Sequence, residues 1–239
     1  MKLLAVDSSG LVASVAIMTE DTVIAEYNVN HKKTHSQTLM PMIDEIVKMA
    51  QIDLSELDYL AVAGGPGSFT GLRIGSATVK GLGLALDLPV VAVPTLEGLA
   101  MNLCGSAYRI CPIMDARRNQ VYTGIYHFED NVLRVDMDQM PMDIHDLLQK
   151  LQQEEGTTVF LGDGVPVYKD IIDQELTRKH IYAPAHLNRQ RAGAVGMRAW
   201  DYVHQGRIQT ATEHAPEYLR LSQAERERQE REKHRHEQV

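Results

Sequence analysis

One glycine-rich stretch decides how this chain folds: Ala63-Gly64-Gly65-Pro66-Gly67-Ser68-Phe69-Thr70-Gly71-Leu72-Arg73-Ile74-Gly75. It follows an apolar run that predicts a buried strand, Tyr59 to Ala63, and it opens a predicted helix that continues to about Leu86. A strand-to-helix turn of this kind can hold a phosphate, because its backbone N–H groups and the helix dipole point at the ligand. Glycines also let a helix pack closely against a neighbour, so the turn has two interpretations.

The established phosphate-binding patterns are incomplete in this stretch. No lysine follows Gly71, as the Walker pattern requires, and the G-x-G-x-x-x-G spacing is not the dinucleotide fingerprint. The G-x-S-x-G nucleophile elbow of serine hydrolases is also missing, since Ser68 directly follows Gly67. The turn is therefore at best half of a phosphate site. The helix after it favours close packing, with three recurring glycines at Gly75, Gly81 and Gly83.

Composition restricts the class of protein. The 239 residues are 44% apolar, enough for one large domain or two small ones, and they carry a net charge of −8. This charge argues against strong autonomous RNA binding, which depends on neutralising phosphates. No run is long enough for a membrane span and the first residues do not form a signal peptide, so we expect a cytoplasmic protein. Solvated surface is expected at the basic pairs, and reduced thiols at the cysteines: Lys32/Lys33, Arg117/Arg118, Arg189/Arg191, Cys104 and Cys111.

The two halves of the chain repeat one order of predicted elements. In the first half a strand ends in Asp7, and a hairpin, a third strand and a helix lead to the strand before the glycine turn. In the second half a strand ends in Asp115, and similar elements lead to the turn Gly162-Asp163-Gly164. This order predicts an α/β protein of the actin-like (ASKHA) type, a duplicated ribonuclease-H-like fold with two lobes, the second reduced. The predicted divisions are 1–108, 109–221 and a charged, solvated or disordered tail, 222–239.

Apolar stripes on two helices of the first half suit contact with a partner. An actin-like lobe buries one side of each helix on its own sheet, so any remaining apolar surface would suit a related subunit. The alternative is that these residues are core, an interpretation that is strong for about half of them. The candidate interface consists of Leu39, Met42, Ile43, Ile46, Leu72, Gly75, Val79, Leu82 and Leu86.

Several motifs together are similar to those of the bacterial TsaB (YeaZ) family. They are Asp7 with its hairpin, His35-Ser36 leading to Leu39 and Pro41, the glycine turn, Asp115-Ala116-Arg117, and Pro216-Glu217-Tyr218-Leu219-Arg220. The resemblance runs from Met1 to about Leu221, and the glycine turn is its most specific part.

Resemblance to this family implies an actin-like fold and a role in making N6-threonylcarbamoyladenosine at position 37 of tRNAs that read codons beginning with A. It implies a non-catalytic scaffold subunit that dimerises with the transferase TsaD and activates it, together with the small ATPase TsaE. In isolation the chain is expected to form a homodimer. It is expected to meet tRNA only through the complex.

The resemblance also implies that a metal site has been lost. Catalytic relatives in this superfamily carry an H-x-x-x-H metal motif, and the matching positions here are Thr95 and Leu99. Neither side chain can replace an imidazole, so we expect no metal and no catalytic residue. His31 and His35 share the spacing, but two lysines lie between them where a strand gives way to a helix, which argues against a metal there.

A residual nucleotide site remains a hypothesis. It would consist of Asp7, Ser8, Gly65, Gly67 and Asp115, and it would bind ATP or ADP weakly, with no other cofactor. The alternative function is an actin-like small-molecule kinase or ATPase that uses Asp7, Asp115 and the glycine turn. The missing lysine and the reduced second half count against it. Tight magnesium-ATP binding with turnover by the isolated chain would favour it.

Overall fold

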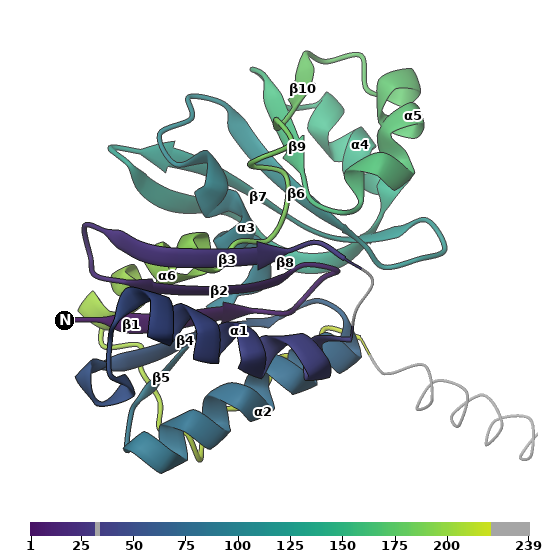
Figure 1. Cartoon of the computed structure of the whole chain (residues 1–239). Coiled ribbons are helices and arrows are strands. Elements are labelled where there is room, and N and C mark those ends of the chain that lie inside the picture. The colour runs from purple at the N-terminus through teal and green to yellow at the C-terminus, as the bar shows by residue number, and fades with distance from the viewer. Residues whose placement is uncertain (32–33, 221–239) are drawn as a thin grey trace, which may run out of the picture.

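The computed structural model describes residues 1–31 and 34–220, so the tail predicted at 222–239 lies outside the described residues (Figure 1). The first half contains β1 (Leu3–Asp7), β2 (Ala13–Met18), β3 (Val23–Val29), α1 (His35–Ala50), β4 (Tyr59–Gly65), α2 (Phe69–Leu86), β5 (Val90–Pro94) and α3 (Thr95–Ala100). The second half contains β6 (Arg109–Asp115), β7 (Gln120–Glu129), β8 (Val132–Asp143), α4 (Ile144–Gln152), β9 (Thr158–Leu161), α5 (Val165–Glu175), β10 (His180–Tyr182) and α6 (Ala192–His204). Short 3-10 turns lie at Leu54–Glu56 and Met101–Leu103. Within these described ranges, no helix is both long and apolar enough to span a membrane.

Each half forms a five-stranded mixed sheet of the same topology. The strand orders are β3-β2-β1-β4-β5 and, read in the matching direction, β8-β7-β6-β9-β10. In both sheets the first three strands pair antiparallel, and the last two run parallel to the first. The predicted duplication is therefore confirmed. The second lobe is reduced in its helices, since α4 and α5 have 9 and 11 residues where α1 and α2 have 16 and 18.

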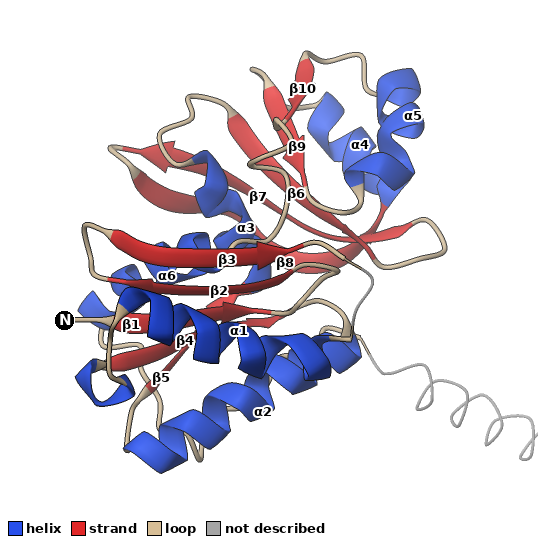
Figure 2. Cartoon of the chain, viewed as in Figure 1, coloured by secondary structure: helices blue, strands red, loops and turns tan. Residues whose placement is uncertain are grey.

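Helices cover both faces of each sheet, but two of them are exchanged between the lobes (Figure 2). Helices α1 and α2 cover one face of the first sheet, and α4 and α5 cover the corresponding face of the second. The opposite face of the first sheet is covered by α6, through Val195 and Trp200. The opposite face of the second sheet is covered by α3, through Leu96 and Leu99. The first sheet thus ends with β5 at Pro94 and the second begins with β6 at Arg109, while the covering helices cross between the two sheets.

The predicted interface stripes face the first lobe's own sheet. Leu39, Ile46 and Val79 are no more than 1% exposed and belong to the core that contains Leu4 and Leu60. An amphipathic helix needs most of its apolar face to cover a sheet, so little of each stripe remains for a partner. Of the nine candidate interface residues, seven are buried (Leu39, Met42, Ile43, Ile46, Leu72, Gly75, Val79) and two are half-buried (Leu82, Leu86).

Candidate functional site

A cleft of about 730 Å³ lies between the lobes, where β1, β4, β6 and β9 end. Ligands of open α/β sheets bind outside the carboxyl ends of the parallel strands, so this is the expected place for a site. The first lobe contributes the hairpin after β1 and the turn before α2. The second lobe contributes Asp115, Arg117 and Asp163, and residues 217–220 complete the lining.

Asp7, at the end of β1, is enclosed beneath the hairpin and is 1% exposed. Its Oδ1 accepts hydrogen bonds from the Ser9 backbone N–H at 2.8 Å and from the Ser9 hydroxyl at 2.7 Å. Burial raises the pKa of Asp7 to about 6, and Asp163 contributes in the same direction, although the Ser9 bonds and His35 lower it. A buried carboxyl with such a pKa, close to a cleft, is typical of a functional site.

Asp115 and Asp163 meet in the second lobe. The Asp115 backbone N–H donates to Oδ1 of Asp163 at 3.3 Å, and Oδ1 of Asp115 accepts from the Arg117 N–H at 2.8 Å and the Tyr168 hydroxyl at 3.0 Å. Burial raises the pKa of Asp163. Asp163 is not among the candidate site residues that the sequence predicts, because a Gly-Asp-Gly turn is common in loops. The signal was the duplication, which puts this turn where the first lobe has its glycine turn.

The glycine turn is docked on the β1–β2 hairpin of the same lobe. The Ser68 N–H donates to the Ser9 carbonyl at 2.6 Å, and the Ser8 hydroxyl donates to the Gly71 carbonyl at 2.9 Å. A Cβ at Gly71 would lie 2.0 Å from the Ser8 carbonyl oxygen, and one at Gly67 would lie 2.4 Å from that of Ser9. The Ser68 hydroxyl oxygen accepts from the Gly71 N–H at 3.3 Å and caps α2. These contacts favour close packing of the turn on the hairpin, rather than phosphate binding, as the role of Gly67 and Gly71.

Gly65 faces a different set of partners. Its N–H donates to the Thr95 hydroxyl oxygen at 3.1 Å, and its carbonyl accepts from the Gln139 side chain of β8 at 2.9 Å. Its φ of +126° is one that residues with a side chain rarely adopt. Thr95, at the first position of the metal motif that the resemblance implies, thus supports the turn.

The histidine pair is not brought together as a metal site. His31 is exposed, whereas His35 begins α1 with Nε2 2.8 Å from the Gly10 carbonyl oxygen. Within residues 1–31 and 34–220, no three His, Cys, Asp or Glu side chains are grouped as metal ligands. Of the residues expected in a residual nucleotide site, Ser8 contacts Gly71 and Gly67 packs on Ser9, so both lie where the glycine turn meets the hairpin. Asp7 lies beneath the hairpin, Gly65 contacts Thr95 and Gln139, and Asp115 lies across the cleft.

The segment 217–220 crosses the mouth of the cleft. The Glu217 N–H donates to the Gly64 carbonyl at 2.7 Å, and the Tyr218 ring packs on Phe69 with centroids 4.6 Å apart. On the other side, Nη1 of Arg220 donates to the Ala116 carbonyl at 3.0 Å. The segment therefore connects the glycine turn of the first lobe to the β6–β7 turn of the second.

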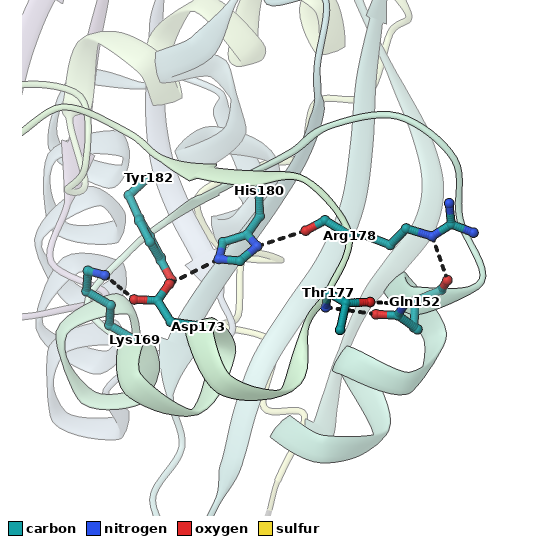
Figure 3. Close-up of polar contacts among 7 residues, drawn as sticks. All are labelled: Gln152, Lys169, Asp173, Thr177, Arg178, His180 and Tyr182. Atoms are coloured by element: carbon teal, nitrogen blue, oxygen red, sulfur yellow. Dashed lines mark hydrogen bonds and ion pairs between the residues drawn. The ribbon is translucent and has the colours of Figure 1, made fainter.

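A second polar cluster lies in the second lobe, on α5 and β10 (Figure 3). Asp173 accepts from Lys169, from the Tyr182 hydroxyl at 2.6 Å and from Nε2 of His180 at 3.0 Å. The neighbouring bonds between Gln152 and residues 177–178 continue the cluster to the end of α4. These contacts hold the edge strand β10 to its covering helices.

The paired sheets, with an aspartate ending β1 and β6 and a cleft between them, define an actin-like (ASKHA) protein. Among solved structures, YeaZ from Pseudomonas aeruginosa matches with a TM-score of 0.76 and 27% sequence identity, covering 91% of this chain and 99% of its own. A family model described as "TsaD: tRNA N6-adenosine threonylcarbamoyltransferase" matches residues 22–228.

Curated relatives show to which family of this class the chain belongs. The tRNA threonylcarbamoyladenosine biosynthesis protein TsaB of Bacillus subtilis (strain 168) is 35% identical over 227 residues, which are 94% of this chain and 96% of that protein. The chain belongs to the TsaB family. The protein of the same name from Escherichia coli (strain K12) is 31% identical over 177 residues, covering 72% of this chain and 75% of its own.

Proposed function

We propose that this chain is the non-catalytic scaffold subunit of a complex that makes tRNA N6-threonylcarbamoyladenosine. It would dimerise with the transferase TsaD, activate it together with TsaE, and meet tRNA through that complex in the cytoplasm. Its curated relatives are named for this biosynthesis. The observation that carries the proposal is the bond between the Gly65 N–H and Thr95, because the residue at the position where the resemblance implies a metal-ligating histidine here supports the backbone.

The glycine turn supports the same conclusion. Its close contacts with Ser8 and Ser9 use the glycines for packing, and Ser68 caps the helix that would otherwise point at a phosphate. We therefore expect weak binding of ATP or ADP in the cleft, without turnover, and no tightly held metal. Elemental analysis of the purified chain that found one zinc or iron ion per chain would contradict the last expectation.

The outward faces of α1 and α2 are the surface we assign to TsaD. The two helices lie side by side on the outer face of the first sheet (Figure 1). Met49 on α1 and Leu84 on α2 are 67% and 64% exposed, although both are large and apolar. A Cβ at Gly81 would meet nothing within 4 Å, so a partner helix can approach α2 closely there. Two such helices from a related subunit would complete a four-helix contact, with the homodimer forming in isolation.

Reconstitution tests the proposal against the kinase alternative. The chain is mixed with TsaD, TsaE, threonylcarbamoyl adenylate, ATP and an A-decoding tRNA, and the modified nucleoside is measured. Leu84→Glu should abolish both TsaD binding and nucleoside formation, because its carboxylate must be desolvated without a counter-charge in an apolar contact. Leu84 suits this test better than Leu82, which is partly buried against the core. Met197→Glu makes the same kind of change at a residue of α6 that is 40% exposed, and it should have no effect.

The second variant is Asp115→Ala, which should leave most activity intact. A kinase or ATPase that held magnesium on this aspartate would show the reverse order of effects. If Asp115→Ala is inactive while folded and bound to TsaD, the scaffold proposal is overturned.

A further inference from the structure

Four arginines in or next to the lining of the cleft have no carboxylate partner within residues 1–31 and 34–220: Arg73, which contacts Phe69 and Tyr218, Arg117, Arg118, which follows Arg117 in the β6–β7 turn, and Arg220. The first three are exposed. Four other arginines of the described residues are paired with acidic neighbours, in the pairs Arg109–Glu154, Arg134–Glu129, Arg191–Glu26 and Arg198–Glu97. The guanidinium groups near the mouth are thus free of such pairing, in a chain whose net charge is −8.

Aromatic rings lie among these guanidinium groups. The Arg73 guanidinium carbon is 4.1 Å from the centroid of the Phe69 ring, and Nε of Arg73 donates to the Tyr218 hydroxyl at 3.3 Å. Tyr218 packs on Phe69 at an interplanar angle of 34° and is still 40% exposed. An exposed ring held in place by a second ring and an arginine is a platform on which a nucleobase can stack.

The platform continues into the second lobe. Nη1 of Arg220 donates to the Ala116 carbonyl, next to the β6–β7 turn. In that turn Arg117, Arg118 and Asn119 all have left-handed φ angles, 64°, 56° and 59°. Three consecutive residues with side chains are unfavourable in this region, and such conformations cluster where function requires them. Here the turn places Arg117 in the lining of the cleft, and the exposed Arg118 follows it.

The carboxylates of the cleft are occupied by donors of the chain itself. Asp115 accepts from Arg117 N–H and from Tyr168, and Asp163 accepts from Asp115 N–H. Oε2 of Glu217 accepts from Gln139 at 3.2 Å. A phosphate inside the cleft would meet Asp115 and Asp163, whereas one lying across the mouth would meet the arginines and, of these carboxylates, Glu217 alone. The arrangement therefore favours a strand that crosses the mouth over a mononucleotide within the cleft.

We propose that this surface binds an unpaired stretch of RNA, with a base stacked on Tyr218 and successive phosphates on Arg73, Arg118 and Arg117. An extended anion fits because the guanidinium groups are spread from α2 in one lobe to the β6–β7 turn in the other. The inference rests on the proposed function, in which the chain acts on tRNA together with TsaD. It makes this subunit a direct contact for the RNA.

The test measures binding of a fluorescent single-stranded RNA dodecamer, and of tRNA, to the complex of the full chain with TsaD. Tyr218→Leu should weaken binding about tenfold by removing the stacking surface, and Tyr218→Phe should retain it. Arg118→Ala should lower the slope of log affinity against log salt by about 0.7, the value for one phosphate of a single strand. Arg134→Ala makes the same charge change at a paired, distant arginine and should leave the slope unchanged.

Each outcome bears on one claim. If Tyr218→Leu and Arg118→Ala bind RNA like the wild type while still bound to TsaD, the RNA platform is wrong and the scaffold function stands. If ATP displaces the RNA at concentrations far below those of the weak nucleotide binding expected in the cleft, the occupant is a nucleotide and the strand proposal is overturned. If wild-type chain does not bind TsaD, the scaffold function is wrong, and the same variants in the isolated chain decide the platform.

Discussion

Arg198 on α6 donates from Nε to Oε2 of Glu97 on α3 at 2.6 Å, and both side chains are buried. The same oxygen accepts from the Tyr202 hydroxyl at 2.9 Å, and Nη1 of Arg198 reaches Asp201 at 2.9 Å. Since α6 covers the first sheet and α3 covers the second, this ion pair joins the two exchanged helices. It fastens the lobes together on the side of the sheets opposite α1 and α2.

Removing the carboxylate of this pair should destabilise the whole protein. Glu97→Ala leaves the Arg198 guanidinium buried with only the half-exposed Asp201, and breaking a buried pair in this way costs about 3–5 kcal/mol. Urea denaturation should show the loss as a lower midpoint for both lobes. Arg134→Ala, which breaks an exposed pair with Glu129, is the control and should not move the midpoint. Equal midpoints for both variants would refute the argument.

Most of the fold could be predicted because its signals are local. Strand runs, helix periodicity and the repeated order of elements can all be read within short windows, and they predict the duplicated sheets correctly. The exchange of α3 and α6 could not be predicted in this way. Its key contact joins residues that are 101 positions apart, and neither helix carries a local sign of which sheet it covers.

The site was predicted less completely, for a related reason. Helical spacing shows that a face of α1 or α2 is apolar, but not whether it meets the chain's own sheet or a partner. Interface and core therefore both remain open for Leu39 and Ile46 until the structure places them in the core. Asp163 was overlooked because a Gly-Asp-Gly turn is common. Likewise, the basic pair Arg117/Arg118 has the pattern of ordinary surface, and only the structure shows that Arg117 lines the same cleft as Tyr218 and Arg220.

Substitution by alanine should change the stability of the protein in opposite directions at two glycines of α2. At Gly71 a Cβ would lie 2.0 Å from the Ser8 carbonyl oxygen, so Gly71→Ala must push the helix off the hairpin and lower the thermal midpoint. At Gly81 a Cβ meets nothing within 4 Å, so Gly81→Ala should stabilise the helix by about 0.5–1 kcal/mol. Scanning calorimetry checks both. A stabilising Gly71→Ala would show that the docking of the turn is loose.

The cluster around Asp173 should hold β10 in place in a pH-dependent manner. Hydrogen bonds from Lys169, Tyr182 and His180 keep the pKa of Asp173 well below its usual range. A lowered pKa means that the stabilisation is present above the ordinary value and is lost as pH falls through the folded one. Asp173→Asn should therefore speed amide hydrogen exchange in β10 at neutral pH. Asp170→Asn, the same change earlier on α5, is the control, and equal exchange in both variants would exclude this role.

Asp7 should make the protein less stable as the pH rises. Burial raises its pKa from 3.8 to about 6, so the folded state binds the proton more tightly than the unfolded state does. The stabilising contribution is complete below pH 4 and disappears as the pH passes 6. At pH 8 the ionised carboxyl then destabilises the fold by about 3 kcal/mol at most, from 1.36 kcal/mol per pKa unit.

Asp7→Asn isolates this effect, because the amide Oδ1 can accept the same two bonds from Ser9 that the carboxylate accepts. Denaturation should show the variant to be more stable than the wild type at pH 8 and nearly equal to it at pH 4.5. Asp53→Asn is the control, and its effect on stability should have the opposite sign. Hydrogen bonds from Ser55 lower the pKa of Asp53, so this variant should be less stable than the wild type at pH 8. If Asp7→Asn is destabilised at pH 8, the carboxylate is needed for the hairpin, and its charge is satisfied where it lies.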